Sequence, residues 1–112
     1  MSRKMISNEP QPERAVLVAI ERRGEELDQD LEELQELVRT AGGDAVEVVV
    51  QRRAAPNPAT YLGSGKVQEV KELAAAHQAD LIIVDDELTP VQARNLNEQL
   101  DRPVLDRTQL IL

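Results

Sequence analysis

The chain has 112 residues, enough for one domain that buries a core without disulfides or metals. It contains no cysteine, which excludes disulfides and thiolate metal sites, and its net charge of −8 argues against a broad basic face for nucleic acid or a DNA partner. A single tyrosine is the only aromatic residue, which argues against a module that stacks bases on aromatic side chains. Without a secretory signal or a membrane-length apolar run, we expect a cytoplasmic location.

The first half of the chain alternates between strand and helix patterns. Residues 1–13 are polar and contain two prolines, so we predict a flexible leader. Residues 14–20 form a short apolar run typical of a buried strand. Residues 26–41 place apolar side chains at helical spacing, and the pair Gly42-Gly43 that follows suits a left-handed helix end. Residues 45–51 contain four valines and predict a second strand.

The second half continues the alternation after a loop. Residues 52–66 contain two prolines and two glycines, which predict irregular structure. We then predict elements over the following ranges: a helix at 67–77, a strand at 80–85, a helix from Thr89 to about Leu100, and a strand at 103–106. Asp106 and Gln109 have the spacing of a capping box for another helix. Because the chain ends inside an apolar run, we expect it to be truncated.

This alternation predicts an α/β domain over residues 14–112. Strands that alternate with helices are joined by right-handed crossovers, so we expect an open four-stranded parallel sheet with helices on both faces. The first and third strands are the most apolar and should be central. We therefore predict the strand order 2-1-3-4, as in Rossmann-like and flavodoxin-like folds.

One candidate anion site precedes the second predicted helix. Gly63, Gly65 and Lys66 resemble the end of a phosphate-binding loop, in which backbone N–H groups and a lysine hold an anion. The opening glycine of such a loop is missing, and Val67 stands where serine or threonine would hold magnesium. We therefore favour a glycine-rich turn that starts a helix, with some anion affinity left at the electropositive helix end.

Acidic side chains mark the ends of the third and fourth strands. Asp85, Asp86 and Glu87 lie where open α/β sheets bind ligands, and they could hold Mg²⁺ or accept a phosphoryl group. A phospho-receiver would also need a lysine after a later strand, and none is present. Asp106 and Arg107 could contact a ligand as well. We favour helix capping and solvated loops for both groups, so the sequence predicts no catalytic residue and no metal site.

Three stretches resemble the N-terminal domain of HflX-type GTPases. They are PATYLGSGK at residues 58–66, DDELTPVQARNL at residues 85–96 and VLDRTQLIL at residues 104–112. They occur in the order and spacing of that family, and the flanking strands and helices extend the resemblance over residues 14–112.

The resemblance implies a role for the whole protein. A helical segment and a GTPase domain would follow this domain, and GTP and magnesium would bind there. The whole protein would bind the large ribosomal subunit, and some members of the family separate stalled ribosomes. The N-terminal domain would contact ribosomal RNA and its own GTPase domain. No cofactor is expected in this stretch itself, although weak ATP binding is ascribed to some members.

We expect the RNA contact at the loop, because residues 51–66 hold three cations and no acid. The predicted contact residues are Arg52, Arg53, Tyr61, Gly63, Gly65 and Lys66. The alternative is that they only shape a turn, with Tyr61 packed on the sheet. A second possible ligand edge comprises Asp85, Asp86, Glu87, Arg94, Asp106 and Arg107. The alternative function is a stand-alone regulatory domain that binds a nucleotide or another small ligand.

Overall fold

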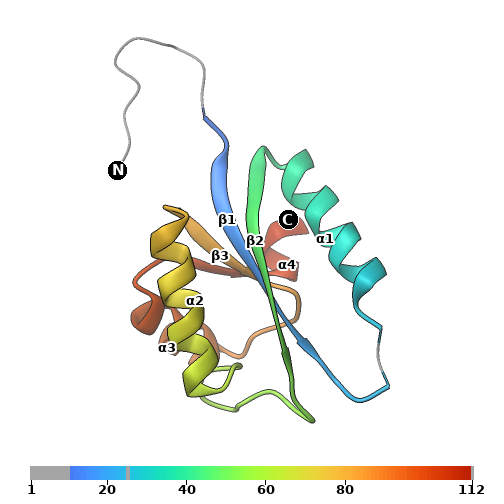
Figure 1. The fold of residues 1–112 in the computed structure, drawn as a ribbon, viewed down its shortest axis with the longest axis vertical. Coiled ribbons are helices and arrows are strands. Elements are labelled where there is room, and N and C mark those ends of the chain that lie inside the picture. The colour runs from blue at the N-terminus through green and yellow to red at the C-terminus, as the bar shows by residue number, and fades with distance from the viewer. Residues whose placement is uncertain (1–10, 25, 112) are drawn as a thin grey trace.

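The computed structural model describes residues 11–24 and 26–111. Its elements in chain order are β1 (Glu13–Glu21), α1 (Asp28–Thr40), β2 (Gly43–Arg52), α2 (Ser64–Ala76), β3 (Leu81–Val84), α3 (Pro90–Leu100), β4 (Val104–Asp106) and α4 (Arg107–Ile111) (Figure 1). Residues 1–10 of the predicted leader lie outside the described residues, as does Leu112 at the other end. Glu13, which we assigned to the leader, is already part of β1.

The four strands of the described chain are parallel, and their order is β2-β1-β3-β4, as predicted. The central strand β1 pairs with β2 along its whole length and with β3 from Ala15 to Val18. Residues 15–20 are buried without interruption because helices cover both faces of the strand. The open parallel α/β sheet predicted from the sequence is therefore confirmed.

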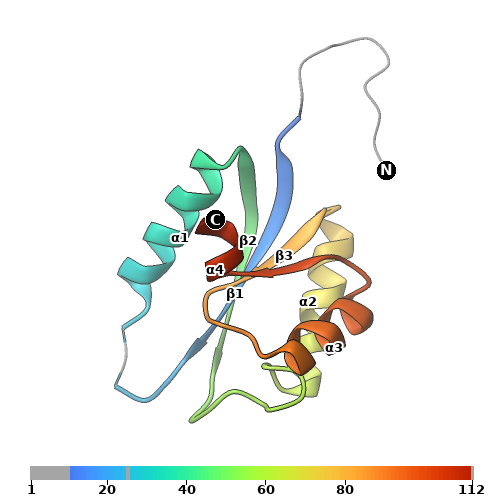
Figure 2. The ribbon, with the colours of Figure 1, turned by 180° about the vertical axis from the view of Figure 1, so that it is seen from behind.

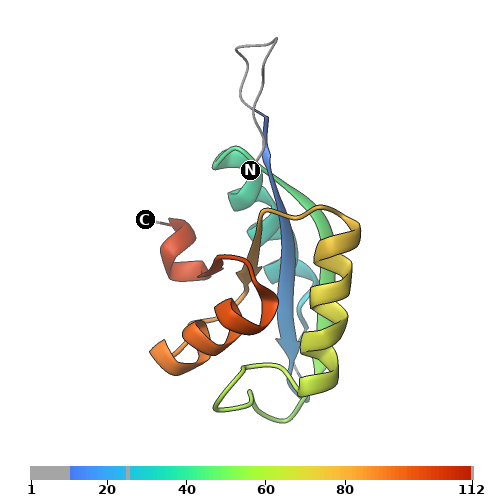
Figure 3. The ribbon, with the colours of Figure 1, turned by 90° about the vertical axis from the view of Figure 1, so that its left-hand side faces the viewer.

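The helices form two layers, one on each face of the sheet. The side chains of α2 and α3 pack against one face, and those of α1 and α4 pack against the other. Figure 3 shows α2 and α4 on opposite sides of β1, and Figure 2 shows α4 beside α1. Consecutive residues of β1 alternate between the two cores, with Val16 and Val18 on the α2 side and Ala15 and Leu17 on the α1 side.

The turn after α1 depends on two adjacent glycines. Gly42 has a φ of 91°, the left-handed helix end that we predicted from its identity. Gly43 opens β2 against the side of α1, where a Cβ atom would lie 2.8 Å from Val38 Cγ1. The first glycine thus supplies the conformation of the turn, and the second allows strand and helix to approach.

Helix α2 begins three residues earlier than we predicted, at Ser64 instead of Val67. The first N–H groups of a helix have no partner within it, so Ser64, Gly65 and Lys66 can form its first turn without strong helix propensity. Gly63 is the N-cap residue and has an extended backbone. Among residues 11–24 and 26–111, no helix has the length and apolar character to cross a bilayer.

Candidate functional site

The loop between β2 and α2 lies against α3. Gln92 of α3 donates its Nε2 hydrogen bond to the carbonyl of Asn57 at 2.8 Å, and Asn95 donates Nδ2 to the carbonyl of Ala59 at 2.9 Å. The Gln92 residue is 6% exposed, so its bond is shielded from water. The polar side chains of residues 85–96 therefore hold the backbone at the start of the stretch 58–66 and of the residue that precedes it.

The same loop is fixed from within. The backbones of Asn57 and Tyr61 exchange hydrogen bonds at 2.9 and 2.8 Å. The Asn57 carboxamide oxygen also accepts from the backbone N–H groups of Ala59 and Thr60. Tyr61 has a φ of 64°, a left-handed conformation that a bulky residue adopts only when its surroundings impose it. The loop thus has a defined shape at this end of the sheet.

The ring of Tyr61 belongs to the core. The residue is 1% exposed, and its hydroxyl lies 3.4 Å from Asp86 Oδ2. Burial and the neighbouring Asp86 carboxylate raise the pKa of this hydroxyl well above its ordinary value. This position agrees with the packing alternative, and it gives Tyr61 no exposed ring surface for RNA.

Asp85 forms an ion pair that ties three elements together. Its side chain is 6% exposed, and its Oδ1 accepts from Arg107 Nε at 2.7 Å. Burial raises the pKa of the Asp85 carboxyl above its ordinary value, while Arg107 opposes that rise. Arg107 also donates Nη2 to the carbonyl of Asp30 in α1. This pair has a structural role between β3, α4 and α1.

The two neighbouring acids turn toward different partners. Asp86 accepts at Oδ2 from Arg22 Nη2 at 3.4 Å and at Oδ1 from the backbone N–H of Glu87. Glu87 is exposed. The described residues contain no group of three or more histidine, cysteine or acidic side chains placed to hold a metal ion. The geometry at the end of β3 is therefore that of turn formation and ion pairing.

Asp106 forms the helix cap predicted from its spacing. It accepts from the backbone N–H of Gln109 at 3.0 Å, and Gln109 Oε1 accepts from the Asp106 N–H at 3.0 Å. Its second oxygen accepts from the backbone N–H of Leu88 at 3.2 Å. Arg94, by contrast, is exposed on α3. The third family-like stretch thus anchors the second, as the second anchors the first.

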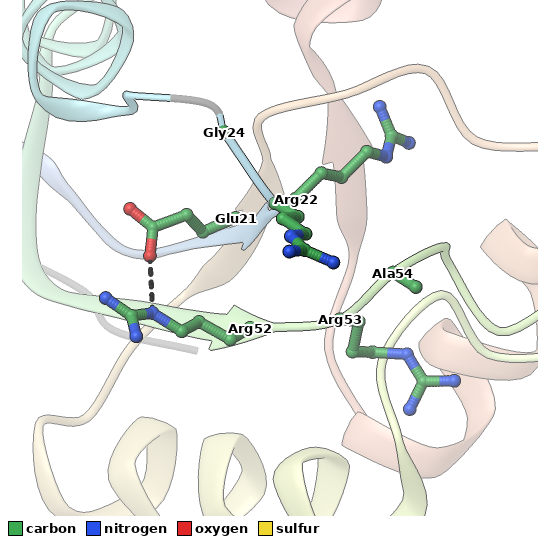
Figure 4. A pocket seen from close by; sticks show the side chains of 7 residues that line it. Glu21, Arg22, Gly24, Arg52, Arg53 and Ala54 are labelled. Atoms are coloured by element: carbon green, nitrogen blue, oxygen red, sulfur yellow. Dashed lines mark hydrogen bonds and ion pairs between the residues drawn. The ribbon is translucent and has the colours of Figure 1, made fainter.

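An open hollow of about 520 Å³ lies at the carboxyl ends of β1 and β2 (Figure 4). Its lining residues are Glu21, Arg22, Arg23, Gly24, Arg52, Arg53 and Ala54. Arg52 and Arg53 are among the contact residues predicted from the sequence, whereas Arg22 and Arg23 are not. The parallel register pairs Glu21 with Arg52, so the Arg-Arg pair at the end of each strand lies at the same edge. This repetition after two adjacent strands was the signal in the sequence.

Two of the three cations selected from the loop have acidic partners outside it. Arg52 Nε lies 2.8 Å from Glu21 Oε1, and Lys66 Nζ lies 3.0 Å from Glu69 Oε1. The absence of acids from residues 51–66 therefore does not leave these two cations uncompensated, because β1 and α2 supply the acids. Arg53 donates Nε to the carbonyl of Ala55.

The two glycines near these cations differ. The backbone N–H of Gly63 donates to Gln51 Oε1 at 3.0 Å, and a Cβ atom there would lie 2.9 Å from Arg53 Nη1. A Cβ atom at Gly65 would meet nothing within 4 Å. Gly63 therefore allows Arg53 to lie close to the start of α2, whereas Gly65 is open to its surroundings.

A protein family and several curated proteins match most of this chain. The family described as "GTP-binding GTPase N-terminal" matches residues 28–112. The GTPase HflX of Lacrimispora saccharolytica is 49% identical over 102 residues, which cover 89% of this chain and 24% of the relative. The GTPase HflX of Escherichia coli is 40% identical over 100 residues, which cover 89% and 24%. The chain thus spans about a quarter of the length of these relatives.

Solved structures share the fold. A GTP-binding protein from Sulfolobus solfataricus, in complex with GDP, superposes with a TM-score of 0.68 at 22% identity and covers 88% of this chain and 29% of its own. The match over most of the chain and the identity to the curated relatives together show the family. The chain belongs to the GTP-binding GTPase N-terminal family and corresponds to the N-terminal domain of HflX GTPases.

Proposed function

We propose that this chain is the effector domain of an HflX-type GTPase, which binds the large ribosomal subunit and separates stalled ribosomes in the cytoplasm. GTP and magnesium would bind in the GTPase domain of the whole protein. The chain matches only a quarter of relatives that are named GTPases, which leaves room for that domain elsewhere in the protein. Its own contribution would be to contact ribosomal RNA and the GTPase domain.

The observation that carries this proposal is the cluster of arginines at one end of an acidic domain. A net charge of −8 repels a polyanion at long range, so a contact with RNA has to be local. Arg22, Arg23, Arg52 and Arg53 surround the hollow and concentrate positive charge there. Guanidinium groups bind phosphates with two parallel hydrogen bonds, which suits contacts with an RNA backbone.

The loop beside the hollow supports the same function. Its shape is fixed by Asn57 within the loop and by Gln92 and Asn95 from α3. A surface that is already ordered loses little conformational entropy on binding. Tyr61 contributes through this shape, since its ring is buried. We therefore assign the contact to the cations and the exposed backbone near Gly65.

The test is the triple variant Arg52→Ala, Arg53→Ala and Lys66→Ala in the full-length protein. Arg52 is exposed, and Arg53 and Lys66 are half-buried. Surface substitutions usually change the free energy of unfolding by about 0.5 kcal/mol or less each, so the melting temperature should stay nearly constant. Co-sedimentation with large ribosomal subunits should weaken, and its salt dependence should flatten by roughly one log unit for each phosphate that the variant no longer binds.

The control removes cations from other elements. Arg39→Ala with Lys71→Ala takes two exposed positive charges from α1 and α2, and it matches the charge change of Arg52→Ala with Arg53→Ala. Only the second pair should weaken subunit binding. Sedimentation of the triple variant equal to that of the parent at every salt concentration would rule out the loop as the contact.

A regulatory domain for a nucleotide or another small ligand is the second candidate. The volume of the hollow, about 520 Å³, is within the range of small-molecule sites, and the arginines of its lining favour a ligand that carries phosphate. Calorimetry of this chain with ATP and with GTP separates the two functions. The effector function predicts binding no tighter than that of a generic polyanion, whereas magnesium-dependent binding at micromolar concentrations favours the second candidate.

A further inference from the structure

We propose that the hollow between the ends of β1 and β2 binds adjacent phosphate groups and that Glu21 sets its affinity as an internal competitor. This inference rests on the proposed function where the phosphates are those of RNA. Glu21 ends β1, Arg52 ends β2, and the sheet register pairs them. Their side chains face each other across the strand ends, with Arg52 Nε 2.8 Å from Glu21 Oε1 (Figure 4).

The lining of the hollow selects for phosphate. Neighbouring strands lie about 4.8 Å apart, so the Arg-Arg pairs 22–23 and 52–53 start from adjacent positions. Besides these arginines and Glu21, Gly24 and Ala54 line the hollow. Among the described residues, no aromatic or large apolar side chain lines it, so they offer nothing to stack on a base or to cover an apolar ligand. The side chains of Arg52 and Arg53 leave the end of β2 in different directions (Figure 4), so the guanidinium groups lie at separate points of the lining, which suits a ligand that presents two or more phosphates.

Glu21 is placed to compete with such a ligand. Its bond to Arg52 uses Nε and leaves both terminal amino groups of the guanidinium outside that bond. The Arg52 side chain is 89% exposed and that of Glu21 is 28% exposed, and an ion pair so open to water contributes little stability. A phosphate can therefore replace the carboxylate at Arg52. The Glu21 carboxylate offsets the positive charge of Arg52 that the phosphates would meet, as the Asp86 carboxylate offsets that of Arg22.

The variant Glu21→Gln separates this competition from a positioning role. Glutamine keeps an oxygen that accepts from Arg52 Nε but removes the negative charge. At the dielectric constant of bulk water, which suits so open a hollow, removing one charge about 6 Å from a bound phosphate should tighten binding about two- to fivefold. The salt dependence of binding should become steeper at the same time. Positioning alone would leave affinity unchanged or lower it.

The experiment uses inorganic tripolyphosphate as the probe and calorimetry of this chain. The control Glu98→Gln removes one exposed carboxylate from α3 and makes the same change in net charge. Glu21→Gln should tighten binding more than Glu98→Gln does, and Arg23→Ala should weaken it several-fold. Three outcomes would overturn the site. They are equal effects of the two glutamine variants, weaker binding of tripolyphosphate by Glu21→Gln, and no binding by any variant.

The source of the phosphates is tested with large ribosomal subunits and the full-length protein. If RNA supplies them, Glu21→Gln should tighten subunit binding, and tripolyphosphate should compete with the subunit. If Glu21→Gln tightens the binding of tripolyphosphate but not that of the subunit, the site binds free polyphosphate and RNA is excluded as its ligand. If the parent does not bind the subunit at all, the proposed function fails, while the tripolyphosphate result still decides the site.

Discussion

The buried hydroxyl of Tyr61 makes the molecule sensitive to alkali. Because the folded state raises the pKa of this hydroxyl above 10.0, the folded protein keeps the proton after the unfolded chain has lost it. The free energy of unfolding should therefore fall as the pH rises above about 10. With one tyrosine and no tryptophan in the chain, the tyrosinate absorbance band should appear only together with the loss of helical circular dichroism.

The variant Tyr61→Phe is the control for this titration. It removes a long hydrogen bond of 3.4 Å to Asp86, so it should cost about 1 kcal/mol or less at neutral pH. Its stability should decline less steeply above pH 10 than that of the parent. Reversible formation of tyrosinate near pH 10 in a chain that keeps its helices would contradict the buried position.

The ion pair of Asp85 with Arg107 predicts a second, acidic pH dependence. Arg107→Ala leaves a carboxylate that is 6% exposed without its cation and should cost about 2 kcal/mol at neutral pH, less than a fully buried pair because Arg107 is 28% exposed. Without Arg107, burial and the neighbouring Asp30 and Asp86 carboxylates raise the folded pKa of Asp85 further. Urea denaturation should show that the variant loses less free energy of unfolding as the pH falls toward 3.8, the ordinary pKa of an aspartate carboxyl. The reason is that a protonated Asp85 needs no cation beside it.

An arginine on α3 provides the comparison. Arg94→Ala removes an exposed guanidinium and should change the free energy of unfolding by less than about 0.5 kcal/mol at any pH. A loss for Arg107→Ala that is equally small, or that stays constant between neutral and acidic pH, would show that the pair does not compensate the buried charge.

At the scale of elements, side chains of α3 hold the loop between β2 and α2 by hydrogen bonds. Thr89 and Gln92 form its reciprocal capping box, and Gln92 also donates to Asn57 in the loop. Thr89→Ala should cost about 1 kcal/mol through the cap alone. Gln92→Ala should cost more, and hydrogen exchange of the amides at 57–62 should accelerate only in this variant. Equal acceleration in both variants would mean that the cap, and not the Gln92 side chain, holds the loop.

The helices and strands themselves were predictable from the sequence. Hydrophobic patterns marked the eight elements of the described chain and the central positions of β1 and β3, because burial on both faces demands continuous apolar runs. The cap residues Thr89 and Asp106 were also recognisable, since a capping box joins residues three apart. Such contacts join residues that are close in the sequence, so a single short stretch is enough to predict them.

Contacts between distant stretches were not predictable in the same way. Gln92 bonds a residue 35 positions away, and nothing in its own neighbourhood indicates that partner. Arg22 and Arg23 gain their place in the hollow only through the register of β1 with β2. The buried position of Tyr61 depends on a left-handed backbone that tertiary contacts impose. These parts of the candidate site required the structure.

Charge is unevenly distributed over the whole molecule. Helix α1 carries exposed acids along its length, whereas the arginines gather at the carboxyl ends of β1 and β2. A polyanion would be repelled by α1 and attracted by the hollow, so the domain should approach RNA in a preferred orientation. This asymmetry accounts for how an acidic domain can present a local cationic surface.

The position of β1 in the sheet also has a consequence for synthesis of the chain. β1 is made first, pairs with β2 soon afterwards, and receives its second partner, β3, only when Leu81–Val84 have been made. At translation rates of about 5 to 20 residues per second, roughly 30 intervening residues take about 2 to 6 s. During that interval the nascent β1 has an open edge rich in apolar residues, which can pair with a strand of another molecule. The nascent chain is therefore most vulnerable to aggregation after β2 has formed and before β3 arrives.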